Sequence, residues 1–96
     1  MFRSFFQKNS SSEFEQAMSA LPGYSVNDLE LMHQVLLKYS MKRPIPFGAS
    51  DPDEYLDMMN NFENSKIPGG PVYGCRTYGE AVRMNHAIVK LLDEME

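Results

Sequence analysis

The residues best suited by type and spacing to bind a ligand lie in a Gly/Pro-rich loop, residues 63–76, which leads into an expected helix at Thr77. Loops longer than about 12 to 15 residues without structure of their own are uncommon and often functional. N–H groups at a helix start attract anions, and glycines let a ligand approach the backbone. The candidate ligand-binding residues here are Lys66, Gly69, Gly70, Tyr73, Arg76 and Thr77. Since the loop lacks the Walker A and dinucleotide-binding patterns, a connector that only turns the chain is the simpler interpretation.

No arrangement typical of catalysis or metal binding is present in the sequence. Apart from hydroxyl groups, the soft-metal and nucleophilic side chains are His33, Cys75 and His86, and none of them has the short ligand spacing of a zinc site. The acidic residues between positions 51 and 57 lack the order of a calcium loop, and helix capping accounts for most of them. We therefore predict a protein that is not an enzyme, with no catalytic residue, no metal and no cofactor.

A short stretch of the chain resembles the phage anti-CBASS sponges, small helical proteins that sequester cyclic nucleotide messengers. The resemblance rests on Gly23-Tyr24, Leu31-Met32-His33 and Lys38. The family pattern has an arginine in place of Ser25 and an asparagine in place of His33, and its spacings differ, so the chain is not assigned to this family. The resemblance implies an alternative function, in which an oligomer binds a nucleotide or another phosphorylated small ligand with Tyr24, Lys38 and Arg76.

Composition and charge exclude several classes of partner. The formal net charge is −4 and the isoelectric point is about 5.1, whereas nucleic-acid-binding domains usually have a value above about 9. We therefore expect no nucleic-acid polymer as a partner. No stretch approaches the ~18 apolar residues that span a bilayer, and the first residues lack the pattern of a signal peptide, so we expect no membrane contact. The lone Cys75 cannot form an intramolecular disulfide, which is typical of a reducing compartment and predicts a cytoplasmic protein.

The apolar pattern predicts an all-α fold. Residues 1–11 form an aromatic and basic N-terminal segment, and residues 12–96 form a single helical domain. Helices are expected over residues 12–21, 25–41, 51–62 and 77–95, in a compact four-helix antiparallel arrangement with the Gly/Pro-rich loop before the last helix. The second and fourth helices should pack together as the main axis of the core. Tyr55, Met58, Met59 and Phe62 should form a buried stripe on the third helix, and the main alternative to a plain loop over 63–76 is a short strand pair.

Several apolar residues are candidates for an interface with another protein. Phe2, Phe5 and Phe6 have the spacing of one helix face, and Met95 ends the apolar stripe of the last helix. Asn85 lies within that stripe, where a polar residue can fix the register of an assembly; an edge position on the stripe is the simpler alternative. The chain also holds 8 methionines, which suit both cores and adaptable binding surfaces.

The leading functional hypothesis is a non-enzymatic protein-interaction domain that works as an oligomer, for example a small viral or accessory inhibitor or adaptor. Its partners would be another protein, further copies of itself, or both. The alternative is the phosphorylated-ligand module built on residues 66–77.

Overall fold

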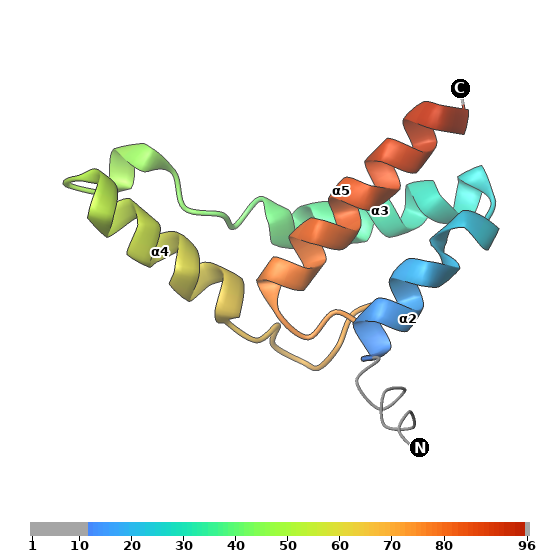
Figure 1. Ribbon diagram of the computed structural model, residues 1–96, viewed down its shortest axis with the longest axis horizontal. Helices are drawn as coiled ribbons and strands as arrows, with labels where there is room; N and C mark the ends of the chain where they lie inside the picture. The colour runs from blue at the N-terminus through green and yellow to red at the C-terminus, as the bar shows by residue number, and fades with distance from the viewer. Residues whose placement is uncertain (1–11, 96) are drawn as a thin grey trace, which may run out of the picture.

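The computed structural model describes residues 12–95, and this part of the chain forms four α-helices without a β-strand (Figure 1). The helices are α2 (Glu13–Ala20), α3 (Val26–Ser40), α4 (Pro52–Asn64) and α5 (Tyr78–Met95), and the short 3-10 helices η1 (Leu21–Gly23) and η2 (Pro46–Gly48) follow α2 and precede α4. The predicted all-α fold is confirmed, and each helix bound agrees with its prediction to within two residues. No helix of residues 12–95 is long and apolar enough to span a bilayer.

Each helix begins at a side chain that caps its first turn. The capping oxygens belong to Ser12, Ser25, Asp51 and Thr77, and they accept hydrogen bonds from the N–H groups of Glu15, Asp28, Glu54 and Glu80 over 2.8 to 3.2 Å. Such a cap satisfies an N–H group that has no partner within the helix, and it stabilises a helix by about 1 kcal/mol. The four helix starts are therefore determined by local sequence.

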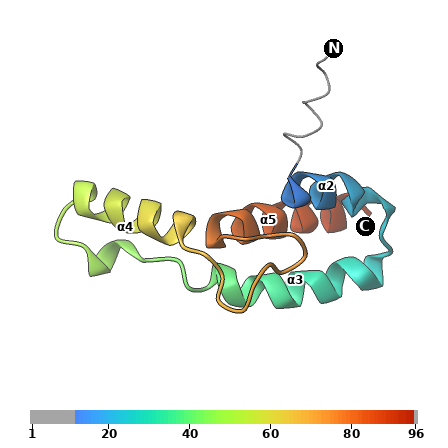
Figure 2. The ribbon, with the colours of Figure 1, turned by 90° about the horizontal axis from the view of Figure 1, so that it is seen from below.

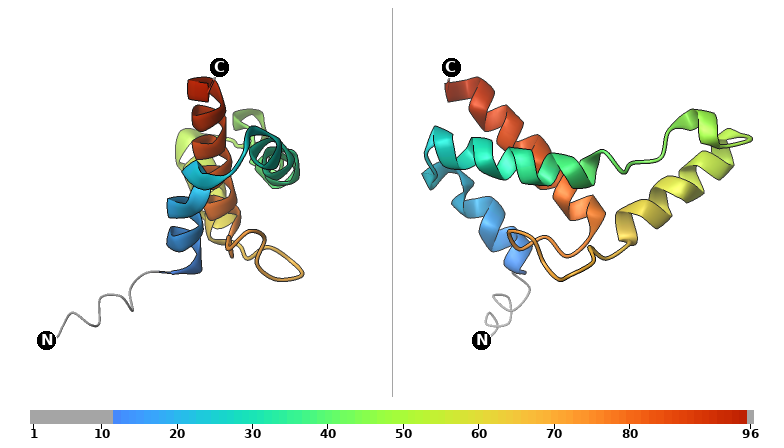
Figure 3. Two further views of the ribbon diagram at one scale, coloured as in Figure 1. Left: turned by 90° about the vertical axis from the view of Figure 1, so that its right-hand side faces the viewer. Right: turned by 180° about the vertical axis from the view of Figure 1, so that it is seen from behind.

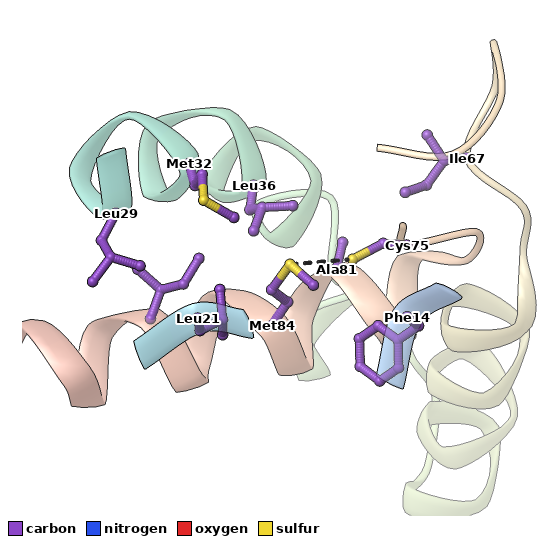
Figure 4. Packing of buried hydrophobic residues seen from close by; sticks show 10 residues of the cluster. Phe14, Leu21, Leu29, Met32, Leu36, Ile67, Cys75, Ala81 and Met84 are labelled. Carbon is purple, nitrogen blue, oxygen red and sulfur yellow. Dashed lines mark hydrogen bonds between the residues drawn. The ribbon is translucent and has the colours of Figure 1, made fainter. Parts of the chain in front are cut away.

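The core lies where α3 crosses α5, which is the most extensive helix pair of the fold (Figures 1 and 2). This confirms that the second and fourth helices form the main axis. The largest fully buried side chains are Leu21, Leu29, Leu36, Cys75, Met84 and Ile88, and Figure 4 shows how Phe14 and Leu21 cover one side of α5 while residues of α3 cover the other. Full burial of one such aliphatic side chain contributes about 1.5 to 3 kcal/mol, so this cluster holds the fold together.

The segment between α4 and α5 folds back on itself without forming a strand pair. It contains two isolated antiparallel bridges, Lys66 with Thr77 and Val72 with Cys75. Buried Ile67 and Cys75 fix this segment to the core. The predicted loop is therefore ordered by backbone pairing and by two apolar anchors.

Helix α4 lies outside the core. It contains no buried residue, and the next buried residue after Leu36 of α3 is Ile67, beyond the end of α4. Figures 1 and 3 show α4 projecting from the crossing of α3 and α5, on the side of α5 opposite to α2. The predicted buried stripe of Tyr55, Met58, Met59 and Phe62 is only half-buried, because α4 contacts η2 and the start of α5 rather than lying along a full helix.

Candidate functional site

The most distinctive surface of the fold is the projecting segment of residues 41–64, here named the α4 arm, which comprises the connector that follows α3 and contains η2, and α4 itself. Large apolar side chains are exposed along it. They are Met41, Ile45, Phe47 and Leu56, with Phe47 96% exposed and Leu56 60% exposed. An exposed apolar side chain is ordinary by itself, but a series of them on one projecting segment is typical of a protein-binding surface.

Aromatic side chains fix the base of the α4 arm. The ring of Tyr78, at the start of α5, lies 5.2 Å from the ring of Phe62 and 6.0 Å from the ring of Tyr39, measured between centroids. A Cβ atom added to Gly79 would lie 2.9 Å from the carbonyl oxygen of Glu63. The end of α4 can therefore approach α5 this closely only because position 79 has no side chain.

The charged side chains of α4 are all acidic: Asp53, Glu54, Asp57 and Glu63. One of them is used locally, because the hydroxyl and the backbone N–H of Ser50 both donate to Oε1 of Glu54. These hydrogen bonds, the hydroxyl one first, lower the pKa of the Glu54 carboxyl from its ordinary value, so this residue stays ionised. The other acidic side chains remain exposed to solvent. Helix α4 thus combines apolar contact area with negative charge, whereas the basic residues of the α4 arm, Lys42 and Arg43, lie before η2.

The start of α5, predicted as an anion site, is occupied by the protein's own carboxylate. Glu80 donates its N–H to Oγ1 of Thr77 over 3.2 Å, and its Oε1 accepts the N–H of Arg76 over 2.7 Å. This is a variant of the capping box, in which the Thr77 and Glu80 side chains each accept a hydrogen bond from a backbone N–H that has no partner within the helix. The Arg76 side chain also has an acidic partner within the chain: its guanidinium lies 3.6 Å from the carboxylate of Glu13 in an exposed ion pair.

The predicted ligand-binding residues do not converge on a single cavity. Lys66, Gly70 and Arg76 line one open cavity of about 390 Å³, whereas Tyr24 and Tyr73 line another of about 250 Å³. Thr77 lines a third, beside Glu63 and Glu80. Gly69 and Lys38 line none of these cavities; Lys38 is exposed on α3, and Gly69 lies in a turn with a positive φ of 87°.

Tyr73 and Gly74 form a tight hairpin turn in this segment. Their φ angles are 53° and 84°, and Val72 and Cys75 on either side exchange two backbone hydrogen bonds of 2.9 Å. Positive φ at both central positions defines a type I′ turn. A Cβ atom on Gly74 would lie 3.0 Å from the carbonyl oxygen of Glu13, so the turn also packs closely against α2.

The candidate histidine, cysteine and asparagine residues have structural surroundings. The predicted interface residue Asn85 is half-buried and contacts His33 of α3 through its side chain. Cys75 is fully buried beside Met84, and this burial raises the pKa of its thiol to about 12, with the charge of Glu80 adding to the effect and that of Arg83 opposing it. A thiol this basic stays protonated near neutral pH and is a poor nucleophile.

The other predicted site residues are placed as follows. Met95 is partly exposed at the end of α5, and Phe2, Phe5 and Phe6 lie outside the residues that the structure describes. Across residues 12–95, no three His, Cys, Asp or Glu side chains gather in a way that could hold a metal ion.

Sequence reasoning did not single out Phe47 or Leu56, the most exposed large apolar residues of η2 and α4. The sequence did contain a signal for Phe47. This residue lies in the Pro-rich connector, outside every predicted helix, so it belongs to no apolar helix face that packing would bury. Leu56 falls just beside the predicted stripe of its helix. Comparison with known proteins adds no further residue: no protein-family model, curated protein or solved structure matches this chain.

Proposed function

We propose that this chain is a non-enzymatic protein-interaction domain and that the α4 arm is its binding surface. The observation that carries the proposal is the absence of any buried side chain between Leu36 and Ile67, a stretch that nevertheless holds exposed Phe47 and Leu56. A segment of this length normally contributes to the core of so small a domain. Its apolar side chains would lose their contact with water in a complex.

Helix energetics support the same function. Isolated helices shorter than about 12 to 15 residues are marginal in water, and tertiary packing supplies most of the stability of a helix in a protein. Helix α4 has 13 residues and packs mainly through its C-terminal end, at Phe62 and Glu63. A partner that covers the α4 arm would supply the packing that the chain itself does not provide. We also propose a cytoplasmic location, because the lone cysteine of the chain, Cys75, is a free thiol, as is typical of a reducing compartment.

The chain offers a matched pair of leucines for testing this proposal. Leu56 on α4 is 60% exposed and Leu31 on α3 is 59% exposed, so either can be replaced by serine at similar cost to stability. We expect Leu56→Ser to weaken binding to the physiological partner, or to further copies of the chain, at least tenfold, and Leu31→Ser to leave it unchanged. Sedimentation equilibrium and co-purification measure both. Equal binding by both variants and the unaltered protein would exclude the α4 arm as the binding surface.

The second candidate function is binding of a nucleotide or another phosphorylated small ligand, and the cavity beside Lys66, Gly70 and Arg76 favours it. Two cationic side chains on one cavity can attract a phosphate group. Native mass spectrometry of protein purified from its host would detect such a ligand as retained mass. Loss of that mass in Arg76→Ala, with the α4 arm intact, would support this function over the first.

A further inference from the structure

A second surface is complementary in charge to helix α4 of the α4 arm. It is a groove of about 430 Å³ between α2 and α5, here named the α2/α5 groove, whose lining residues are Met18, Val82, Arg83, His86, Ala87 and Lys90. Its floor is apolar and its titratable side chains are all basic. The guanidinium of Arg83 is held in place over the ring of Phe14, 5.0 Å from the ring centroid.

We propose that two copies of this chain bind each other reciprocally, with α4 of each copy seated in the α2/α5 groove of the other. This inference rests on the proposed function of the α4 arm and names its partner. The charge pattern carries it, because the charged side chains of α4 are all acidic and those that line the groove are basic. Opposite charges on two separate surfaces of one chain favour self-association.

Helical spacing makes the two surfaces compatible. Asp53 and Asp57 are four residues apart on α4, as are His86 and Lys90 on α5, so each pair is separated by about 6 Å along its helix axis. Lys90 can form an ion pair with one aspartate, and a ring N–H of His86 can donate a hydrogen bond to the other. Leu56 follows Asp53 by three residues, so it lies beside the two aspartates on the helix surface and would meet the apolar floor of the groove. The contact would therefore place an apolar side chain next to polar and charged pairs, as is usual in a protein interface.

Helix α4 cannot occupy the α2/α5 groove of its own chain. Helix α4 and helix α2 lie on opposite sides of α5, and the end of α4 is fixed at Gly79 (Figures 1 and 3). The basic N-terminal segment is a poorer occupant than α4, because Arg3 and Lys8 would face the like charges of the groove. A second copy supplies the acidic helix, and two-fold symmetry then forms the contact twice.

Charge reversal on each surface tests the proposal. The arm variant carries Asp53→Lys and Asp57→Lys, the groove variant carries His86→Glu and Lys90→Glu, and Glu30→Lys on the exposed face of α3 is the control. Sedimentation velocity should show that the unaltered protein and the control are dimers. It should also show that each variant alone dissociates, with a Kd raised at least tenfold, and that an equimolar mixture of the two variants recovers the dimer. In that mixture, every acidic surface again meets a basic one.

A monomeric unaltered protein, variants that dimerise normally, or a mixture that fails to recover the dimer would each overturn the proposal. Circular dichroism of each variant verifies that its helices are intact. The Leu56→Ser and Leu31→Ser pair separates this result from the broader function. If Leu56→Ser weakens binding while charge reversal leaves it unchanged, the α4 arm binds a surface other than the α2/α5 groove; if neither has an effect, the proposed function fails as well.

Discussion

Nδ1 of His33 and Oδ1 of Asn85 lie 2.6 Å apart, joining the middle of α3 to the middle of α5 by a side-chain hydrogen bond. Since the Asn85 oxygen can only accept, His33 donates from Nδ1. Both residues are half-buried beside the apolar core. The bond therefore fixes how the two main helices cross.

Removal of either partner should leave the other without a hydrogen bond in a partly buried position. We expect His33→Leu or Asn85→Leu to lower the free energy of unfolding by about 1 to 2 kcal/mol each. The double variant should lose less than the sum of the two, because no unpaired group then remains. Urea denaturation of all four proteins measures this coupling, and strictly additive losses would show that the bond contributes nothing. Association through the α4 arm should not change in Asn85→Leu.

Local signals explain how much of the fold was predictable. Ser12, Ser25 and Thr77 each stand three residues before an acidic residue, and each proves to be a helix cap. The apolar period along residues 26–40 and 78–95 predicted which faces meet in the core. Such features depend only on residues within one or two helical turns, so they can be predicted from the sequence alone.

Contacts between distant residues were not predictable in the same way. His33 and Asn85 are 52 positions apart, and neither has a local pattern that points to the other. The apolar stripe of α4 predicted a helix with one buried side, but periodicity does not tell whether the covering surface belongs to the same chain. The close approach of Gly79 to Glu63, and hence the direction of the α4 arm, depends on the folded packing.

Cys75 should make stability depend on alkaline pH. Its folded pKa of about 12 lies above the ordinary value of 9.0, so its contribution is complete below about pH 9 and is lost as the pH rises toward 12. Across this range the free energy of unfolding should fall by up to about 1.4 kcal/mol per pH unit from this group alone. Urea denaturation at about pH 8 and about pH 10 should show a smaller pH-dependent loss in Cys75→Ala than in the unaltered protein. An identical loss in both would contradict the burial of the thiol.

Gly79 should be essential for the placement of the α4 arm. A Cβ atom at this position would meet the backbone of Glu63, whereas one at Gly23 would meet nothing within 4 Å. We expect Gly79→Ala to cost about 1 to 3 kcal/mol despite the better helix propensity of alanine, because the end of α4 must move. Gly23→Ala is the control and should be close to neutral. Thermal denaturation compares the two, and a stabilised Gly79→Ala variant would contradict the observed approach.

Tyr73 should be replaceable by asparagine with a gain in stability. Its φ of 53° is unfavourable for a tyrosine, and Asn-Gly is the preferred pair for a type I′ turn. We expect Tyr73→Asn to raise the free energy of unfolding by about 0.5 to 1 kcal/mol. Tyr24→Asn is a matched control, because Tyr24 is similarly exposed but has a negative φ. A destabilised Tyr73→Asn variant alongside a neutral control would show that the tyrosine ring itself is needed at the turn.

Hydrogen exchange of the α4 backbone tests the central claim most directly, that the α4 arm is a binding surface left uncovered by its own chain. In dilute protein, the amides of residues 56–62 should exchange much faster than those of buried stretches in α3 and α5, because α4 has no buried side chain. Raising the protein concentration, or adding the physiological partner, should slow exchange in α4 selectively. Protection of α4 equal to that of α3 in the dilute monomer, unchanged by concentration or partner, would contradict the account.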